Sequence, residues 1–151
     1  MDALDKRILR ALQANGRMAW SQLSEQVHLS ASACQRRVEA LIRDGVIEAF
    51  TVSLNQEALG YGVRAFINVN IDRQQTDQAE AFRRQILRHS NVQACHMVSG
   101  NIDFILDVVA DSLDSFSDFI DGDLLNMPAV KDASSSIVLR EIKPFRAAIG
   151  G

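Results

Sequence analysis

The segment from Ser30 to Arg43 carries arginines and small polar residues with the chemistry needed to read DNA. An arginine can donate two hydrogen bonds to guanine, a glutamine suits adenine, and small side chains let a helix approach the bases closely. Helices that enter the major groove contact bases mainly through their N-terminal half. The predicted base contacts are therefore Ser32, Ala33, Gln35 and Arg36.

Three further residues are candidates for the DNA surface. Ser30 and Arg17 are predicted to meet phosphate groups, because they lie at the start of this helix and in the turn before the preceding one. Arg37 stands beside the apolar side of the helix, so it has either a DNA-binding or a structural role. The alternative for the whole surface is a solvated polar face on a small helical domain.

Three helices must position these side chains. An apolar stripe predicts a first helix that ends at Asn15-Gly16, and a second helix is expected over residues 20–27. The third helix should begin after Ser30, a natural N-cap, and end at Asp44-Gly45, where glycine can adopt the left-handed conformation. Its buried side is predicted to consist of Cys34, Val38, Leu41 and Ile42.

Residues 46–54 alternate between apolar and polar, which predicts a short strand or wing after the three helices. A short helix, a tight turn and a second helix form a helix-turn-helix, and the wing would make it a winged one. We expect this domain to span residues 1–53, followed by a linker over 54–62 and a second domain over 63–151.

The second domain has the pattern of an α+β fold. Alternating apolar residues predict a strand over 63–71, and helical spacing predicts a helix over 77–89. Then follow strands over 92–99 and 104–110, a helix over 113–126 and a last strand over 134–142. The order β-α-β-β-α-β predicts a ferredoxin-like sandwich with one uncovered sheet face, for which self-association is expected. The last helix should bury Leu113, Phe116, Ile120 and Leu124.

The charge distribution argues for a DNA-binding surface of a few placed arginines. Residues 1–60 contain seven Lys and Arg against seven Asp and Glu, and residues 61–151 contain nine against twelve. A general nucleic-acid binder is more basic. One copy of the helix-turn-helix should therefore bind weakly, and a dimer would double the number of arginines.

Other classes of function are disfavoured. The sequence contains no run of 18 apolar residues, so no membrane span is predicted. No signal peptide is evident, and a cytoplasmic location is therefore expected. The sequence contains no phosphate-binding glycine loop and no zinc spacing, and its three histidines are scattered. Cys95 and His96 are adjacent on a strand and must point to opposite faces. We predict no enzymatic activity, no metal and no cofactor.

The order of several motifs resembles the Lrp/AsnC (feast/famine) family of transcriptional regulators. The matching segments are LDKRILRALQANGR, LSEQVHLSASACQRRVEALIRDGVI, VSLNQEALGYG, CHMVSGNIDFIL and MPAV. The resemblance implies a winged helix-turn-helix joined to an ACT-like (RAM) ligand-sensing domain. It also implies homodimers that often assemble into octamers, double-stranded DNA as partner, and a small molecule, usually an amino acid, as effector.

The resemblance further implies an effector site around the loop between the second and third strands of the sensing domain. The Asp103 carboxylate would accept an α-ammonium group, and backbone N–H groups near Gly100 would bind an α-carboxylate. The alternative is a plain hairpin turn that Asp103 caps. The residues implied are Met97, Val98, Gly100, Asn101, Asp103, Leu113, Ser136 and Ile137.

Three positions depart from the family pattern. Asn101 stands where many members carry a second acid, so one acceptor charge is missing. Ala19 replaces the usual serine cap of the second helix, and His28 replaces the usual glycine of the turn.

The sequence as a whole leaves three hypotheses for the function of the protein. The one we favour is an amino-acid-responsive transcription factor. The others are an effector-independent architectural DNA-binding protein and a small ACT-like enzyme or carrier.

Overall fold

The computed structural model describes residues 1–72, 76–145 and 147–150 and divides into two compact units. The first unit comprises Met1–Ser53 together with the C-terminal segment Lys143–Gly151, and the second comprises Leu54–Ile142. Each unit has a separate apolar core. The two are described one after the other.

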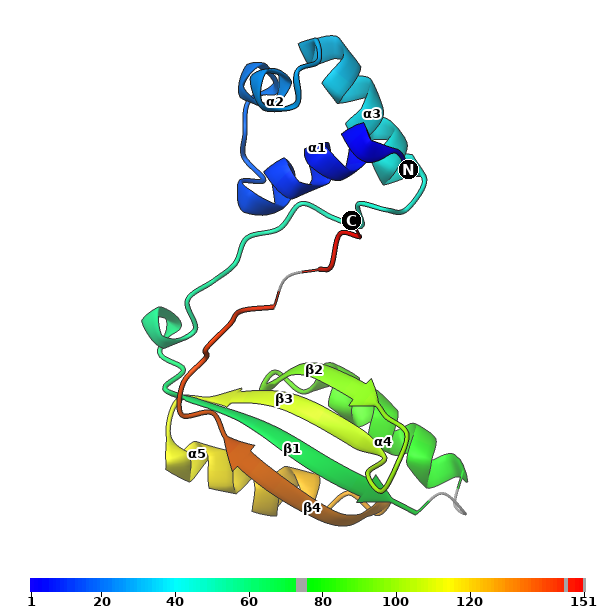
Figure 1. Cartoon of the computed structure of the whole chain (residues 1–151). Coiled ribbons are helices and arrows are strands. Elements are labelled where there is room, and N and C mark those ends of the chain that lie inside the picture. Colours follow the sequence, from blue (N-terminus) through cyan, green and yellow to red (C-terminus); the bar gives the residue numbers. More distant parts are fainter. Residues whose placement is uncertain (73–75, 146, 151) are drawn as a thin grey trace. The chain divides into compact units, whose positions relative to one another are not determined.

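Three helices form the first unit: α1 (Ala3–Ala14), α2 (Trp20–Val27) and α3 (Ala31–Arg43) (Figure 1). Their periodic apolar residues meet in one small core, as the sequence predicts. The Ser30 hydroxyl accepts the N–H of Ala33 and so caps α3, and Gly45 follows the helix with φ of +71°. The core consists of Ile8, Leu23, Val27, Cys34, Val38 and Leu41.

The turn between α2 and α3 contains a left-handed histidine. His28 has φ of 57° and ψ of 48°, and its N–H donates to the carbonyl oxygen of Ser24. The cap at the other end of α2 is incomplete, because Ala19 has no side-chain acceptor and only the Gln22 side chain accepts the Ala19 N–H. Two of the three departures noted in the sequence, Ala19 and His28, therefore lie at the two ends of the same helix.

Two predictions for this unit are wrong. Residues 46–54 form no strand, and the described residues of this unit contain no strand that could pair with them. The N–H groups of Val46 and Ile47 donate instead to the carbonyl oxygen of Leu41. Ile42 is 46% exposed, because α3 turns its buried stripe toward α1 and α2 through Cys34, Val38 and Leu41.

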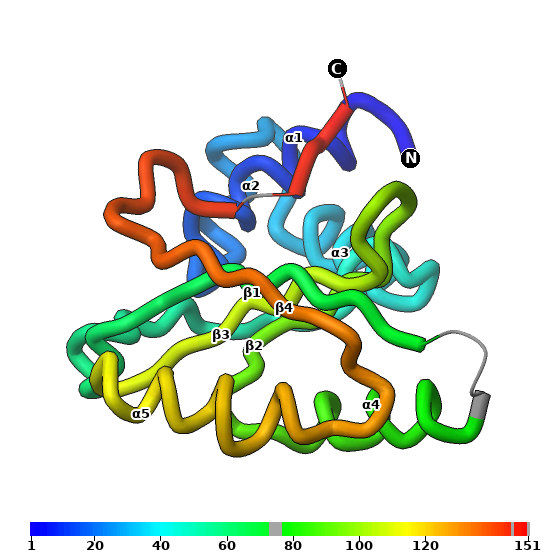
Figure 2. The backbone as a smooth tube through the Cα atoms, turned by 90° about the horizontal axis from the view of Figure 1, so that it is seen from below, coloured from blue at the N-terminus to red at the C-terminus, as the bar shows by residue number. Residues whose placement is uncertain are grey.

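The second unit is a four-stranded antiparallel sheet with the order β2-β3-β1-β4, which is the ferredoxin-like order. After the short helix η1 (Glu57–Leu59) come β1 (Val63–Ile71), α4 (Thr76–Arg88), β2 (Val92–Met97) and β3 (Phe104–Ala110). Then follow α5 (Leu113–Asp118), η2 (Phe119–Leu124) and β4 (Val130–Ile137). The helices α4 and α5 both lie on one face of the sheet (Figures 1 and 2).

The alternation of β1 determines what each face of the sheet contains. Ala65, Ile67, Val69 and Ile71 are buried beneath the helices, where they contact the apolar residues of α4, α5 and β3. Phe66 points to the uncovered face, opposite Asp107 of β3.

The helix expected over 113–126 is shorter and irregular. It begins as the α-helix α5 and continues as a π-helix, η2, whose wider turn brings Phe119 and Leu124, five residues apart, into the core. The predicted burial of Leu113 is wrong, since this residue is 58% exposed, and Ile120 is only half-buried.

The last strand begins and ends earlier than predicted. β4 covers Val130–Ile137, and not 134–142, because its pairing with β1 starts opposite Ile71 and stops opposite Ala65. Beyond that point, Leu139 and Ile142 have no strand to pair with and are exposed.

The left-handed positions give a test of local stability. Because His28 is exposed and pays the cost of a left-handed non-glycine residue, we expect His28→Gly to stabilise the protein by about 1 kcal/mol. Gly45→Ala should destabilise it by a similar amount, although a Cβ there would meet no atom within 4 Å. Thermal unfolding measures both; a His28→Gly variant that melts earlier would contradict the strain argument.

Candidate functional site

The predicted base contacts lie at the exposed N-terminal half of α3. Ser32, Gln35 and Arg36 are exposed, and Ala33 is half-buried. Gln35 donates through Nε2 to Oε1 of Glu39 at 2.9 Å, which orients its amide along the helix. Arg36 makes no hydrogen bond or ion pair within residues 1–72, 76–145 and 147–150. Its guanidinium is therefore available to an external partner.

The predicted phosphate contacts have local roles as well. The Ser30 hydroxyl caps α3 and lies 3.2 Å from the Ser32 hydroxyl. Arg17 is exposed in the turn after α1, where its backbone N–H donates to Oδ1 of Asn15.

Arg37 is engaged within the protein. Its NH1 nitrogen lies 2.8 Å from Oδ2 of Asp2 and 2.7 Å from Oδ1 of Asp5. Hydrogen bonds to Asp5 and Asp2 raise the pKa of this guanidinium further above its usual range. Of the two roles that the sequence leaves open for Arg37, this geometry favours the structural one.

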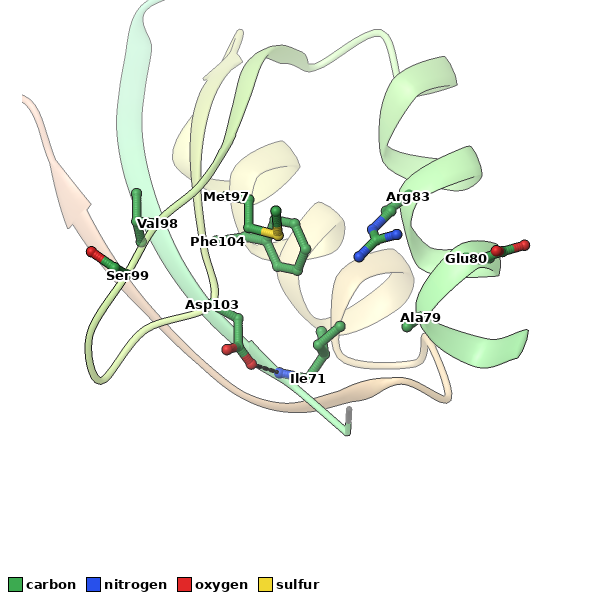
Figure 3. A pocket seen from close by; sticks show the side chains of 9 residues that line it. All are labelled: Ile71, Ala79, Glu80, Arg83, Met97, Val98, Ser99, Asp103 and Phe104. Carbon is green, nitrogen blue, oxygen red and sulfur yellow. Dashed lines mark hydrogen bonds between the residues drawn. The ribbon is translucent and has the colours of Figure 1, made fainter. Parts of the chain in front are cut away.

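A second candidate site, the α4 pocket, lies between the loop that follows β2 and helix α4 (Figure 3). Its volume of about 590 Å³ falls within the range of roughly 300–1,000 Å³ that is typical of small-molecule sites. Three of the predicted effector residues line it, namely Met97, Val98 and Asp103. The other lining residues are Ile71, Ala79, Glu80, Arg83, Ser99 and Phe104.

The Asp103 carboxylate binds the loop between β2 and β3, called the pocket loop below, to the end of β1. Asp103 is only 8% exposed, and its Oδ2 accepts the N–H of Ile71 at 2.9 Å. Its own N–H donates to the carbonyl oxygen of Val69 and to Oδ1 of Asn70. Asp103 therefore has the turn-stabilising role that the sequence offers as an alternative, and it also lines the pocket.

Arg83 is the cation of the α4 pocket. Its guanidinium points from α4 toward Phe104 and Met97, whereas Glu80 points away from them (Figure 3). Glu80 lies near Arg84, with 3.6 Å between their charged groups, while Arg83 has no carboxylate partner among the described residues. Sequence reasoning missed Arg83; the available signal was its place one turn after Ala79, at the border of the buried stripe of α4.

The remaining predicted effector residues fall into two places. Gly100, with φ of +116°, and exposed Asn101 belong to the pocket loop but do not line the pocket. Ser136 and Ile137 pair with Phe66 and Ala65, near the opposite end of β1. Four residues along the strand, or about 13 Å, separate that position from the loop. Leu113 follows β3 at the same distant end, so one copy does not bring all these residues together.

Nucleophilic and metal chemistry find no support in the described residues. Burial raises the pKa of the thiols of Cys34 and Cys95, so both remain protonated at neutral pH. Across residues 1–72, 76–145 and 147–150, no three His, Cys, Asp or Glu side chains cluster in a way that could hold a metal ion. None of the helices described has the length and apolar content needed to cross a membrane.

Comparisons with known proteins match both units. Residues 1–42 match the AsnC-type helix-turn-helix domain, and residues 64–148 match the Lrp/AsnC ligand binding domain. The leucine-responsive regulatory protein of Rhizobium meliloti is 38% identical over 143 residues, which are 95% of this chain and 92% of that protein. Its namesake from Escherichia coli K12 is 32% identical and is covered over 87% of its length.

Solved structures show the same fold over almost the whole chain. A transcriptional regulator from Neisseria meningitidis in complex with L-Met has a TM-score of 0.91 and 36% identity, covering 95% of this chain and 93% of that one. An AsnC family regulator from Agrobacterium tumefaciens has a TM-score of 0.89 and 26% identity, with 98% and 96% covered.

The helix-turn-helix and the ligand-binding sandwich together define a DNA-binding transcriptional regulator with a ligand-binding domain. Within that class, this chain belongs to the Lrp/AsnC family. The resemblance seen in the sequence motifs is thus confirmed, as is the ferredoxin-like α+β fold of the second unit.

The exposure of Arg36 gives a test of the DNA surface. The DNA used is the duplex that the unmodified protein enriches from a random-sequence library. We expect Arg36→Ala to weaken binding to this duplex by about 1–3 kcal/mol, because a base contact is lost. Arg43→Ala removes the same charge from the other end of α3, where Arg43 already pairs with Asp44. Fluorescence anisotropy measures both affinities. Equal losses would contradict a position-specific contact by Arg36.

Proposed function

We propose that this regulator binds specific DNA sequences through α3 and responds to a free amino acid in the α4 pocket. The observation that carries the proposal is the chemistry of that pocket, which combines an apolar wall with groups of opposite charge. Met97, Phe104 and Ile71 supply apolar contacts, Arg83 supplies a cation, and Asp103 supplies a carboxylate.

A free amino acid carries its carboxylate and its ammonium group on the same carbon atom. Arg83 suits the carboxylate because a guanidinium donates two parallel hydrogen bonds. The ammonium group would approach the Asp103 side of the pocket, and the side chain would lie against Met97 and Phe104. This wall favours an aliphatic or thioether side chain over a charged one.

The solved relative supports the chemical class of the effector. The Neisseria meningitidis regulator, with 36% identity to this chain, was crystallised with L-Met. An apolar amino acid of that size agrees with the lining of the α4 pocket.

A second candidate function is that of an architectural DNA-binding protein without an effector. Two observations favour it: Asn101 occupies the place of a second acid, and Oδ2 of Asp103 is already used by the Ile71 N–H. If these features have removed the effector response, the second unit serves only for assembly.

A thermal-shift screen of the twenty amino acids separates the two functions. We expect at least one apolar amino acid to raise the melting temperature, because a ligand at 100 times its Kd stabilises the folded state by about 2.7 kcal/mol. The methyl ester of that amino acid, which lacks the carboxylate, should give a much smaller shift.

Arg83→Ala should abolish the shift, whereas Arg84→Ala, which removes the same charge one residue away, should keep it. Equal responses of the two variants would contradict the role of Arg83. The absence of any shift with all twenty amino acids would favour the architectural function.

We also propose that the uncovered sheet face joins two copies of the chain. Phe66 is 41% exposed at its centre, with the Arg64 guanidinium 5.6 Å from its ring. Arg64 also pairs with Asp107 at 2.7 Å and with Glu141 at 3.0 Å, so its guanidinium already has carboxylate partners within its own chain. Further assembly into octamers remains a prediction from the family resemblance.

Sedimentation analysis tests this interface. Phe66→Asp should shift the mass toward the monomer, because it places a carboxylate next to Asp107 on a face that must be desolvated. Leu87→Asp changes an exposed apolar residue of α4, which lies on the helical side of the sheet, and should leave the mass unchanged. A Phe66→Asp variant with the mass of the unmodified protein would contradict the proposed face.

A further inference from the structure

A closed network of hydrogen bonds joins Asp2 and Asp5, at the start of α1, to Arg37 of α3. Oδ1 of Asp2 accepts the N–H of Asp5, and Oδ2 of Asp5 accepts the N–H of Asp2, each at 2.8 Å. The remaining oxygen of each carboxylate accepts a hydrogen bond from NH1 of Arg37, at 2.8 Å for Asp2 and 2.7 Å for Asp5. Every carboxylate oxygen of the pair therefore has a donor.

The network is better ordered than an ordinary surface ion pair. Surface pairs contribute little because two flexible side chains must be fixed. Here the capping bonds already orient both carboxylates, and the Asp5 side chain is only 15% exposed. The N–H of Asp5 and the guanidinium of Arg37 hold the pKa of Asp2 below its usual value, so this carboxylate is ionised at neutral pH.

The network fixes a part of α3 that the apolar core leaves free. Cys34, Val38 and Leu41 attach one side of α3 to the core. Arg37 adds an attachment beside that stripe, and it directly follows Arg36 in the chain. Neighbouring residues of a helix are separated by about 100°, so a rotation of α3 that moved Arg36 would have to break the bonds of Arg37.

The surroundings of Arg37 are unsuited to DNA. Two carboxylates and one guanidinium give the network a net negative charge, which repels phosphate groups. Arg37 would also have to leave both carboxylates to reach a phosphate, and each would lose a charged donor.

We propose that Arg37 is a positioning residue, which sets the rotation of α3 through Asp2 and Asp5 and so places Arg36 for DNA without contacting DNA itself. The proposal rests on the DNA-binding role of the helix-turn-helix in this family. It assigns Asp2 and Asp5, at the start of α1, a part in DNA recognition that acts through Arg37.

Salt-dependent DNA binding by the full-length protein tests the proposal on the duplex enriched from a random-sequence library. We expect Arg37→Ala to weaken binding on the order of tenfold, the scale of coupling within one ion-pair network. The slope of log K against log salt should remain that of the unmodified protein. A phosphate contact would instead lower the slope by about one for each bound copy.

Asp5→Asn provides a readout of opposite sign for the two roles. Asparagine keeps an oxygen for the capping bond but loses the charge that binds Arg37. Positioning predicts that Asp5→Asn weakens binding, and that the double variant with Arg37→Ala is no weaker than Arg37→Ala alone. If Arg37 contacted phosphate, removing the negative charge of Asp5 would strengthen binding.

Thermal unfolding completes the test, with Arg37→Lys as a second variant should Arg37→Ala fold poorly. A lysine keeps the charge but has no planar fork, so positioning predicts a Kd between those of the unmodified protein and Arg37→Ala. A lower melting temperature with unchanged Kd, a reduced salt slope in Arg37→Ala, or tighter binding by Asp5→Asn would each overturn the proposal.

Discussion

A buried carboxylate, that of Asp103, fixes the candidate ligand site by accepting a hydrogen bond from the N–H of Ile71. It joins the end of the central strand β1 to the loop before β3, at the point where the register between β1 and β4 shifts. Without it, a backbone N–H beside the core would lack a partner, and the loop would lose one of its attachments to β1, next to those that the N–H of Asp103 makes to Val69 and Asn70. Met97 and Phe104, which form the apolar wall of the pocket, pair with each other at the ends of β2 and β3 on either side of this loop.

The same physical device occurs in the first unit. Asp2 and Asp5 accept backbone N–H groups at the start of α1, and that fixes their carboxylates where Arg37 of α3 reaches them. In both units a carboxylate that accepts a backbone N–H also lies at a candidate site: Asp103 lines the α4 pocket, and Asp5 binds Arg37 of α3. Substitution of such a residue therefore changes function and local stability together, and measurements of both are needed to separate them.

The hydrophobic periodicity of the sequence and its capping and turn residues were sufficient to predict most of the fold. The alternation over 63–71, the Ser30 cap and the left-handed Gly45 all follow from local chemistry. The π-helix at Phe119 does not, because the core beneath the sheet selects Phe119 together with Leu124. Arg37 and Arg83 were equally hard to assign: the partners of Arg37 lie more than thirty residues away, and the pocket of Arg83 exists only once α4 covers the sheet.

The proposed function couples two equilibria, because DNA binding by α3 would depend on amino-acid binding in the α4 pocket. The most direct measurement is the Kd for the library-selected duplex, determined without additive and with each of the twenty amino acids at saturating concentration. We expect at least one apolar amino acid to change this Kd by about fivefold or more, as is typical of coupled sites. The same Kd with all twenty would contradict it.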